Sequence, residues 1–304
     1  MQGKQQTPEK EQEQNTRQEQ NTPQKQNTRQ DGQPAGKDIL SILFPSIAVY
    51  LRGSMSNVYL CARRLATAPE RRRSADTDAT ASMLDQNYYR AIRMLNNLSL
   101  CSYFNDPAPL PMRSGDIVKP VREICAKAEY LLNARDVSVS FSCVRERYAC
   151  MFSRFALEEI LYQLLSNAAK FTPSGGKIHV ELRPENGQIL LSETDSGPGV
   201  PPEQVPILFE RYRHPERMDP PPHAFGLGLS ICRVLAEKHG GAMRAEFPSG
   251  GGSRFTLAVP DVRPENPAVL VSESKTDRMG GFDPMLAALS ESLPPEAFST
   301  RKKK

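Results

Sequence analysis

The first 37 residues contain almost nothing that a folded core could bury. Residues 2–37 have no Val, Ile, Leu, Met, Phe, Tyr or Trp, and they include three related hexapeptides, EQNTRQ (13–18), EQNTPQ (19–24) and KQNTRQ (25–30). Ordering a residue costs roughly 1–2 kcal/mol, and a segment without apolar side chains cannot offset that cost. The sequence therefore predicts a disordered tail over residues 1–37.

Other absences narrow the class of protein. The longest apolar run, residues 39–51, contains a proline and is shorter than the roughly 20 residues that cross a bilayer, so no membrane span is expected. The net charge is only +4 and the basic residues form no stripe with aromatics, which gives no case for nucleic-acid binding. The six cysteines show neither CxxC pairs nor metal-ligand spacing, which favours reduced thiols and a cytoplasmic location.

Apolar residues first recur at helical spacing between residues 38 and 105. Two amphipathic helices are predicted here. Their apolar stripes are Leu40, Leu43, Ile47, Leu51, Val58 and Leu65, and Leu84, Tyr88, Ile92, Leu95 and Leu98. The polar stretch 67–80 is typical of the loop of a helical hairpin. One stripe per helix makes a poor core, so we expect dimerisation into a four-helix bundle, with packing on the downstream domain as the alternative.

The downstream part of the chain mixes helices with strand pairs. The proline content of residues 106–116 indicates a linker. Helices are predicted at 119–134, 155–171 and 225–239, and strands at 137–144, at 149–152, within 175–195 and within 242–260. This mixture predicts an α+β fold, a two-layer α/β sandwich over residues 116–260. Residues 261–304 are expected to be a mostly disordered tail with a short helix near 283–293.

A set of polar residues and glycines stands out in this domain. The members, in chain order, are Gln163, Asn167, Lys170, Asp195, Gly197, Gly199, Gly226 and Gly228. The first three share one helical face at i, i+4 and i+7. Glycines at a helix start let bare N–H groups approach a phosphate, which the helix dipole also favours. Asp-x-Gly alone commonly just reverses the chain, but the ordered combination favours a nucleotide site.

Four motifs in this region resemble a known family. LLSNAAKFTPSGGKI is similar to an asparagine box, ETDSGPGV to a first glycine box, ILFERYR (207–213) to a phenylalanine box, and FGLGLSICRVLAEKHGG to a second glycine box. Residues 116–260 thus resemble the ATP-binding domain of sensor histidine kinases. That domain belongs to the GHKL or Bergerat group, with the gyrase-type and heat-shock chaperone ATPases. Nearly half the chain is covered by the resemblance.

The resemblance implies a role for each site residue. Asp195 would accept a hydrogen bond from the adenine amino group, and Gly197 and Gly199 would let the base lie against the backbone. Asn167 would hold Mg²⁺ through its side-chain oxygen, a hard ligand that suits this ion. Lys170 would pair with phosphate oxygens. The implied cofactors are therefore ATP and Mg²⁺.

The same resemblance assigns the rest of the pocket. Phe171 would pack near the base. Gly226, Leu227 and Gly228 would begin the helix beneath the phosphates. Residues 210–224 would form the mobile lid.

Two departures from the family pattern fall inside this pocket. Gln163 stands where related kinases carry asparagine and related ATPases a general-base glutamate. A glutamine amide can position water but cannot take up a proton at neutral pH, so hydrolysis of the gyrase type is in doubt. Ala224 replaces the first glycine at the end of the lid.

A third departure concerns the hairpin. VYLRGSM (49–55) stands where the family shows His-Glu-Leu-Arg-Thr-Pro-Leu, with Val49 in place of the histidine and Tyr50 in place of the acidic residue. Residues 1–178 contain no histidine, and the four in the chain are His179, His214, His223 and His239. A phosphorylated imidazole is a reactive donor, whereas phosphoserine and phosphotyrosine are stable esters. Autophosphorylation on a histidine of the hairpin is therefore not expected.

These observations favour a histidine-kinase-like signalling protein that binds Mg·ATP, lacks its own phosphoacceptor and belongs to two-component signal transduction. The partners expected are ATP, a second copy of the chain, and a response regulator or another protein. One alternative is a protein-serine kinase of the anti-sigma type acting in trans, which the hairpin argues against. Another is a non-catalytic dimeric scaffold, which the retained Asn167, Lys170 and Asp195 argue against.

Overall fold

The computed structural model describes residues 39–211, 226–264 and 281–300. These residues belong to the compact unit that begins at Lys37. The predicted disordered tail over 1–37 and all of the predicted lid except residues 210 and 211 lie outside the described residues, as do Ala224, His214 and His223.

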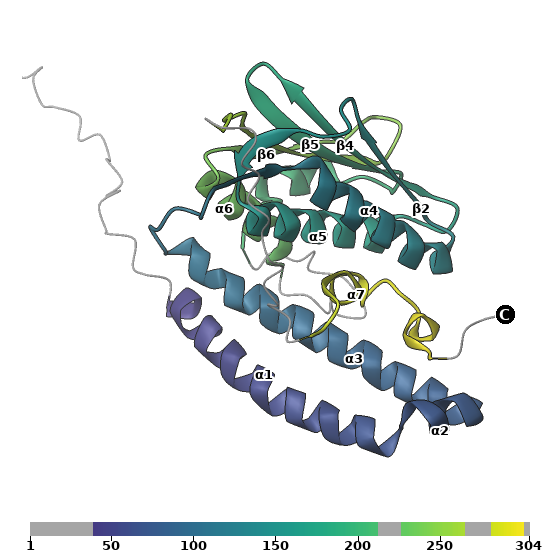
Figure 1. Cartoon of the computed structure of the whole chain (residues 1–304). Helices are drawn as coiled ribbons and strands as arrows, with labels where there is room; N and C mark the ends of the chain where they lie inside the picture. The colour runs from purple at the N-terminus through teal and green to yellow at the C-terminus, as the bar shows by residue number, and fades with distance from the viewer. Residues whose placement is uncertain (1–38, 212–225, 265–280, 301–304) are drawn as a thin grey trace, which may run out of the picture. The chain divides into compact units, whose positions relative to one another are not determined.

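The unit begins with a long helical hairpin. Helix α1 (Ile39–Leu65) packs along α3 (Ala75–Leu100), with the short α2 (Ala68–Arg73) between them (Figure 1). The prediction of a loop over 67–80 is wrong in part, because α2 and the start of α3 occupy it. A capping box formed by Thr67 and Glu70 begins α2, and Ser74 caps α3 by accepting from the Thr77 N–H.

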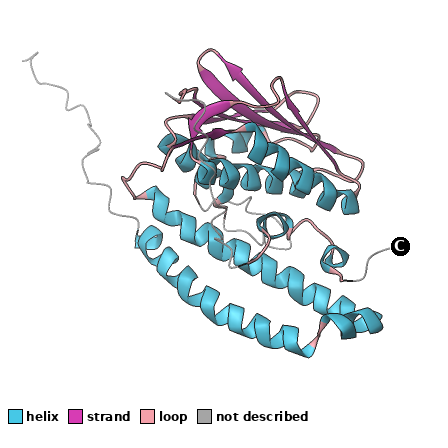
Figure 2. Ribbon diagram, in the orientation of Figure 1, coloured by secondary structure: helices cyan, strands magenta, loops and turns pink. Residues whose placement is uncertain are grey.

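The rest of the unit is an α+β two-layer sandwich, as predicted (Figure 2). One sheet has the order β2-β4-β5-β7-β6, with β2 and β4 parallel and the other pairs antiparallel, and β1 pairs with β3 separately. The strands are β1 (Arg113–Asp116), β2 (Ser138–Cys143), β3 (Ala149–Phe152), β4 (Lys177–Glu185), β5 (Gln188–Asp195), β6 (Ala242–Glu246) and β7 (Ser253–Pro260). The helices are α4 (Val118–Leu132), α5 (Arg154–Phe171) and α6 (Gly228–Lys238), and they lie on one side of the sheet.

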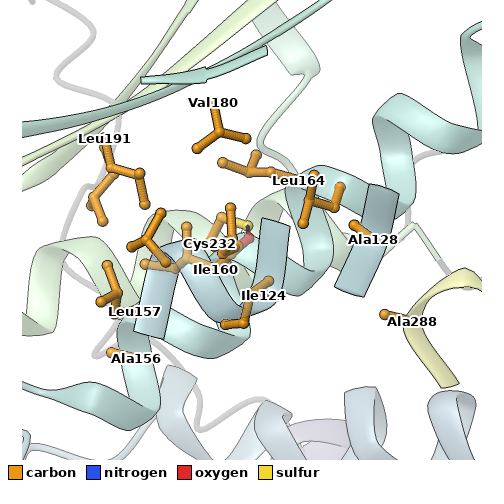
Figure 3. Packing of buried hydrophobic residues seen from close by; sticks show 14 of the residues in the cluster. Ile124, Ala128, Ala156, Leu157, Ile160, Leu164, Val180, Leu191, Cys232 and Ala288 are labelled. Carbon is orange, nitrogen blue, oxygen red and sulfur yellow. Dashed lines mark hydrogen bonds between the residues drawn. The ribbon is translucent and has the colours of Figure 1, made fainter. Parts of the chain in front are cut away.

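The core lies between these helices and the inner face of the sheet. Alternation along β4 turns Ile178, Val180 and Leu182 inward. Figure 3 shows Val180 and Leu191 of the sheet facing Ile160 and Leu164 of α5. Helix α5 is buried along most of its length, so it is the central element on which the sheet, α4 and α6 meet.

Residues 281–300 contain the short helix expected near 283–293, and more of this segment is ordered than the expectation of a mostly disordered tail allowed. They form α7 (Pro284–Leu289) and a 3-10 turn (Pro295–Phe298), and α7 lies between α3 and α5 (Figure 1). Asp283 caps α7 by accepting from the Met285 and Leu286 N–H groups. The physical reason is apolar burial, since Met285, Leu289 and Leu293 belong to the main core.

The hairpin also packs on the sandwich through the end of α3. Asn96 donates a hydrogen bond to the Glu159 side chain of α5, and Asn97 accepts one from the Gln163 side chain. Leu95 and Leu98 of α3 belong to the main core. The outer helix α1 keeps large apolar side chains in solvent, among them Val49, Tyr50, Val58 and Leu65. None of the described helices is long and apolar enough to cross a membrane.

Candidate nucleotide-binding site

Asp195 ends β5 and its carboxylate is held in a fixed direction. Its Oδ1 accepts a hydrogen bond from the Gly197 N–H at 2.7 Å, and Ser253 of β7 also bonds to it. The side chain is buried. Burial raises the pKa of Asp195, and the hydrogen bonds from Gly197 and Ser253 oppose that rise. A short, oriented acceptor of this kind is what recognition of an amino group on a flat ring requires.

The glycines after Asp195 are required by the space around them. A Cβ on Gly197 would lie 2.7 Å from the Asp195 Oδ1 and 3.0 Å from the Phe171 carbonyl oxygen. Gly199 has a φ of +78°, which side chains rarely tolerate. Bare backbone at residue 197 therefore allows the turn after β5 to lie directly against the end of α5.

A third glycine, from the predicted glycine hairpin of residues 249–257, supports the same turn, although the sequence did not single out Gly252 itself. The Gly252 N–H donates to the Gly197 carbonyl at 2.7 Å, and a Cβ on Gly252 would lie 2.4 Å from the Asp195 carbonyl oxygen. The stretch SGGGSRFTL signals a glycine hairpin. Only the pairing of β5 with β7 shows that this hairpin supports Asp195.

The second glycine-rich turn begins α6. Gly226 has a φ of +63°, Leu227 is 1% exposed and caps the helix, and Gly228 is its first residue. A Cβ on Gly228 would lie 3.0 Å from the Gln163 Oε1, so this turn packs on the third turn of α5.

Both glycine turns therefore lie against α5. One meets it at Phe171 and the other at Gln163, eight residues earlier (171 − 163), which is about 12 Å along the helix axis. Asn167 lies between these points and is half-buried, Lys170 is exposed, and Phe171 is 47% exposed. The Lys170 Nζ lies 5.4 Å from the centre of the Phe171 ring. Gly197 and Gly228 therefore contact α5 on either side of Asn167, and the roles of the predicted ligand residues stay a prediction.

Gln163 is placed differently from the other polar residues of α5. Its side chain is 4% exposed, and its Nε2 donates to the Asn97 Oδ1 of α3 at 2.7 Å. A water-positioning role for Gln163 stays a prediction. Asn97 itself was not singled out from sequence, and no local pattern marks it.

A second carboxyl group lies on the same side of β5 as Asp195. Glu193 is 1% exposed, sits between Val180 and Phe255 in the strand register, and its Oε1 has no hydrogen-bond partner. Burial, and then the nearby Asp195 carboxylate, raise the pKa of Glu193 well above its ordinary value. Burial at this position therefore favours the neutral acid form of Glu193 over the carboxylate.

The two described histidines have structural partners. The ring nitrogens of His179 on the open sheet face meet the Ser140 and Ser142 hydroxyls at 2.8 and 2.9 Å. His239 is 7% exposed and its Nε2 accepts from the Ser153 N–H at the start of α5. Burial lowers the pKa of His239, which keeps the ring neutral and able to accept this bond.

A hollow of about 350 Å³ lies elsewhere, at the C-terminal end of α4 beside β2. It is lined by Glu129, Tyr130, Asn133, Asp136, Val137, Ser138, Gly175 and Gly176. None of the predicted ligand residues lines this hollow. We therefore assign the candidate site to the part of α5 that both glycine turns contact.

Comparison with known proteins identifies the sandwich. Residues 153–263 match the family described as "Histidine kinase-, DNA gyrase B-, and HSP90-like ATPase". Residues 153–263 therefore form a histidine kinase-like ATPase domain. This ATPase domain contains every predicted ligand residue, from Asn167 to Gly228, and ATP is the ligand of its family. The resemblance that the four motifs indicated is confirmed.

Relatives of the ATPase domain are signalling kinases. The chain is 31% identical to the "Adaptive-response sensory kinase SasA" of Rippkaea orientalis over 205 residues, which are 62% of this chain and 50% of that protein. It is 27% identical to the "Alginate biosynthesis sensor protein KinB" of Pseudomonas aeruginosa, over 63% of this chain and 31% of that protein. The chain thus spans half or less of the length of these relatives.

A solved structure shares the fold over three quarters of the chain. Full-length ShkA in complex with AMPPNP aligns with a TM-score of 0.59 and 20% identity, over 75% of this chain and 47% of that one. At this identity the likeness shows the fold alone. The aligned share exceeds the ATPase domain, so it includes part of the helical region.

Proposed function

We propose that this chain is a histidine-kinase-like signalling protein that binds Mg·ATP and lacks its own phosphoacceptor histidine. The observation that carries the proposal is the meeting of two glycine-rich turns on one amide-bearing helix. The first turn presents Asp195 at the Phe171 end of α5, and the second begins α6 at Gln163. Asn167 and Lys170 lie between the two ends.

The donor set fits Mg·ATP. The Asp195 carboxylate would bind the adenine amino group, since Gly197 and Ser253 already hold it in place. The Asn167 side-chain oxygen would hold Mg²⁺, which prefers hard oxygen ligands and bridges phosphates. Lys170 would pair with phosphate oxygens. When bound, the nucleotide would supply the phosphoryl group, and these residues would orient it and balance its charge.

The acceptor of that group would lie on another protein. Residues 1–178, which include the whole hairpin, contain no histidine. His179 is exposed, but both of its ring nitrogens are hydrogen-bonded to serines, and His239 is buried, so neither presents an unpaired ring nitrogen to solvent as a phosphoacceptor would. The proposed partner is a response regulator or another signalling protein. If no phosphoryl group is transferred, the proposal is that the bound nucleotide acts as a conformational switch.

We further propose that two copies associate through α1. Tyr50, Val58 and Leu65 share one side of α1 and are 76%, 68% and 84% exposed, an unusual density of large apolar side chains on one helix in water. A second hairpin packed against them would complete a four-helix bundle.

Hydrogen exchange on the full chain tests the nucleotide site. Addition of a non-hydrolysable ATP analogue with Mg²⁺ is expected to slow exchange at the C-terminal half of α5, at residues 195–199 and at the first turn of α6. Omission of Mg²⁺ should weaken this protection. Protection confined to another surface, such as the hollow beside Asn133, would contradict the proposal.

Labelled ATP tests the transfer. After incubation of the chain with labelled ATP and a candidate partner, acid treatment distinguishes phosphohistidine, which is acid-labile, from phosphoserine. We expect no acid-labile label on this chain. Acid-labile label on it would overturn the claim about the missing acceptor, and acid-stable label on the partner would favour the serine-kinase alternative.

A further inference from the structure

A buried amide pair joins the hairpin to the ATPase domain. The Gln163 Nε2 of α5 donates to the Asn97 Oδ1 of α3 at 2.7 Å, and the two side chains are 4% and 8% exposed. In a buried setting, removal of one partner leaves the other polar group unsatisfied at a substantial cost. The pair therefore fixes the orientation of the Gln163 carboxamide.

The other end of that carboxamide reaches the predicted phosphate end of the site. The Gln163 Oε1 lies 3.0 Å from the position that a Cβ on Gly228 would take. This is closer than ordinary van der Waals contact for a Cβ, so only glycine fits without displacing Gln163. Gly228 is the first residue of α6. Three residues from three helices, Asn97, Gln163 and Gly228, thus form a continuous line of contact.

We propose that Asn97 is a positioning residue for the nucleotide site. Asn97 holds Gln163 beneath the first turn of α6, and in this way it links the position of hairpin helix α3 to the binding of the phosphates. The proposal rests on the proposed function for its ligand. It assigns Gln163 to positioning of backbone rather than of water. Asn97 touches neither nucleotide nor metal, and it acts only through Gln163.

The direction of the effect follows from close packing. Protein interiors transmit displacement because they have few voids. A shift of α3 along α5 would break the amide pair, release the Gln163 side chain and loosen the turn at Gly228. By linkage, any such coupling is reciprocal, so a bound nucleotide would also strengthen the docking of α3 on α5.

The chain offers a matched control one residue away. The Asn96 Nδ2 donates to the Glu159 Oε2 at 3.2 Å, so it also joins α3 to α5. Glu159 lies one turn before Gln163 on α5. Loss of the Asn96 bond would weaken the same interface without releasing Gln163.

The experiment compares Asn97→Leu, Asn97→Asp, Gln163→Leu, the double variant Asn97→Leu/Gln163→Leu, and Asn96→Leu in the full chain. Affinity for a non-hydrolysable Mg·ATP analogue is measured by calorimetry. Hydrogen exchange at residues 228–231 is measured without nucleotide. Asn97→Asp is a rescue variant, because its carboxylate still accepts from the Gln163 Nε2.

We expect Asn97→Leu to lower the affinity about tenfold, within the range typical of coupled pairs. Exchange at residues 228–231 should rise in the same variant. Asn97→Asp should stay close to wild type, Asn96→Leu should change the affinity less than twofold, and the double variant should be no weaker than the single ones. Equal losses for Asn96→Leu and Asn97→Leu, or additive losses in the double variant, would overturn the proposal.

The two proposals can fail separately. If the wild-type chain binds no ATP analogue, the proposed function fails, while the exchange rates of residues 228–231 without nucleotide still decide whether Asn97 orders the first turn of α6. If the wild type binds and Asn97→Leu changes neither affinity nor exchange, the positioning role alone fails.

Discussion

Glu193 is a single side chain whose charge state the fold decides. It is 1% exposed, its Oε1 is unpartnered, and burial raises its pKa well above the ordinary value of 4.5. The folded state therefore keeps a proton that the unfolded chain loses as the pH rises past that value. By linkage, the contribution of Glu193 to the free energy of unfolding falls as the pH rises from its ordinary pKa toward its raised pKa.

Glu193→Met is expected to remove this loss of stability at higher pH. Methionine keeps a similar length without a polar group, so the variant should be more stable than wild type by about 1–3 kcal/mol at pH 8. The gain should shrink at pH 5. Urea unfolding at both pH values measures it, with the exposed Glu185→Met as control. Parallel pH profiles for wild type and Glu193→Met would show that this carboxyl group pays no burial cost.

His239 gives a pH dependence of opposite sign. Burial lowers its pKa below the ordinary 6.5, and its Nε2 accepts from the Ser153 N–H only when neutral. Stability should therefore fall as the pH drops below about 6.5. His239→Gln can accept the same bond without taking up a proton, and it should flatten the profile between pH 7.5 and 5. An unchanged profile would assign the acid sensitivity to other groups.

At the scale of elements, the short helix α2 is held by one buried guanidinium. Arg71 is 0% exposed and bonds the carboxylates of Asp78 and Asp85 at 2.8 and 2.7 Å. Its Nη2 also donates to the Phe298 carbonyl of the C-terminal segment. Burial alone would raise the pKa of Asp78, but hydrogen bonds from Ser299, Arg71 and Thr300 outweigh it and lower the pKa to about 2.

Arg71→Ala is therefore expected to cost about 3–5 kcal/mol of the free energy of unfolding, because two buried carboxylates lose the buried guanidinium between them. The exposed neighbour Arg72→Ala should change it by less than about 0.5 kcal/mol. Chemical denaturation of the full chain compares the two variants. Similar small losses for both would mean that the ion pairs do not hold the hairpin end to the C-terminal segment.

This network also explains why part of the fold escapes prediction from sequence. Strands such as β5 and helices such as α5 follow from the period of their own apolar residues. Helix α2 has no such pattern, since APERRR resembles a polar loop. Arg71 is buried through contacts with distant residues, namely Asp78, Ser82, Asp85 and Phe298. The packing of α7 has the same origin, because a local pattern indicates a helix but not its neighbour.

The residues of the candidate site also differ in whether the sequence predicts them. The motifs identify Asn167, Asp195 and the glycines by their spacing. The residues that hold them, Ser253 behind Asp195 and Asn97 behind Gln163, come from distant elements and carry no local signature. Supporting contacts of this kind depend on tertiary packing, so the sequence predicts the ligands better than it predicts their supports.

At the scale of the whole molecule, the exposed face of α1 predicts association of two chains. Val58→Glu is expected to abolish it, because a charge would be buried between the hairpins while it stays in solvent in a single chain. Val144, which is 87% exposed on the ATPase side, provides the control Val144→Glu. Light scattering of wild type should give twice the 33.8 kDa of one chain. One-chain mass for the wild type would refute the dimer.

Calorimetric titration of the full chain with a non-hydrolysable ATP analogue and Mg²⁺ tests the central claim most directly. The account predicts one site per chain and a loss of about 10- to 100-fold in affinity for Asp195→Asn, the equivalent of one hydrogen bond to a charged group. Titration of wild type without binding, or an Asp195→Asn variant that binds as tightly as wild type, would contradict it.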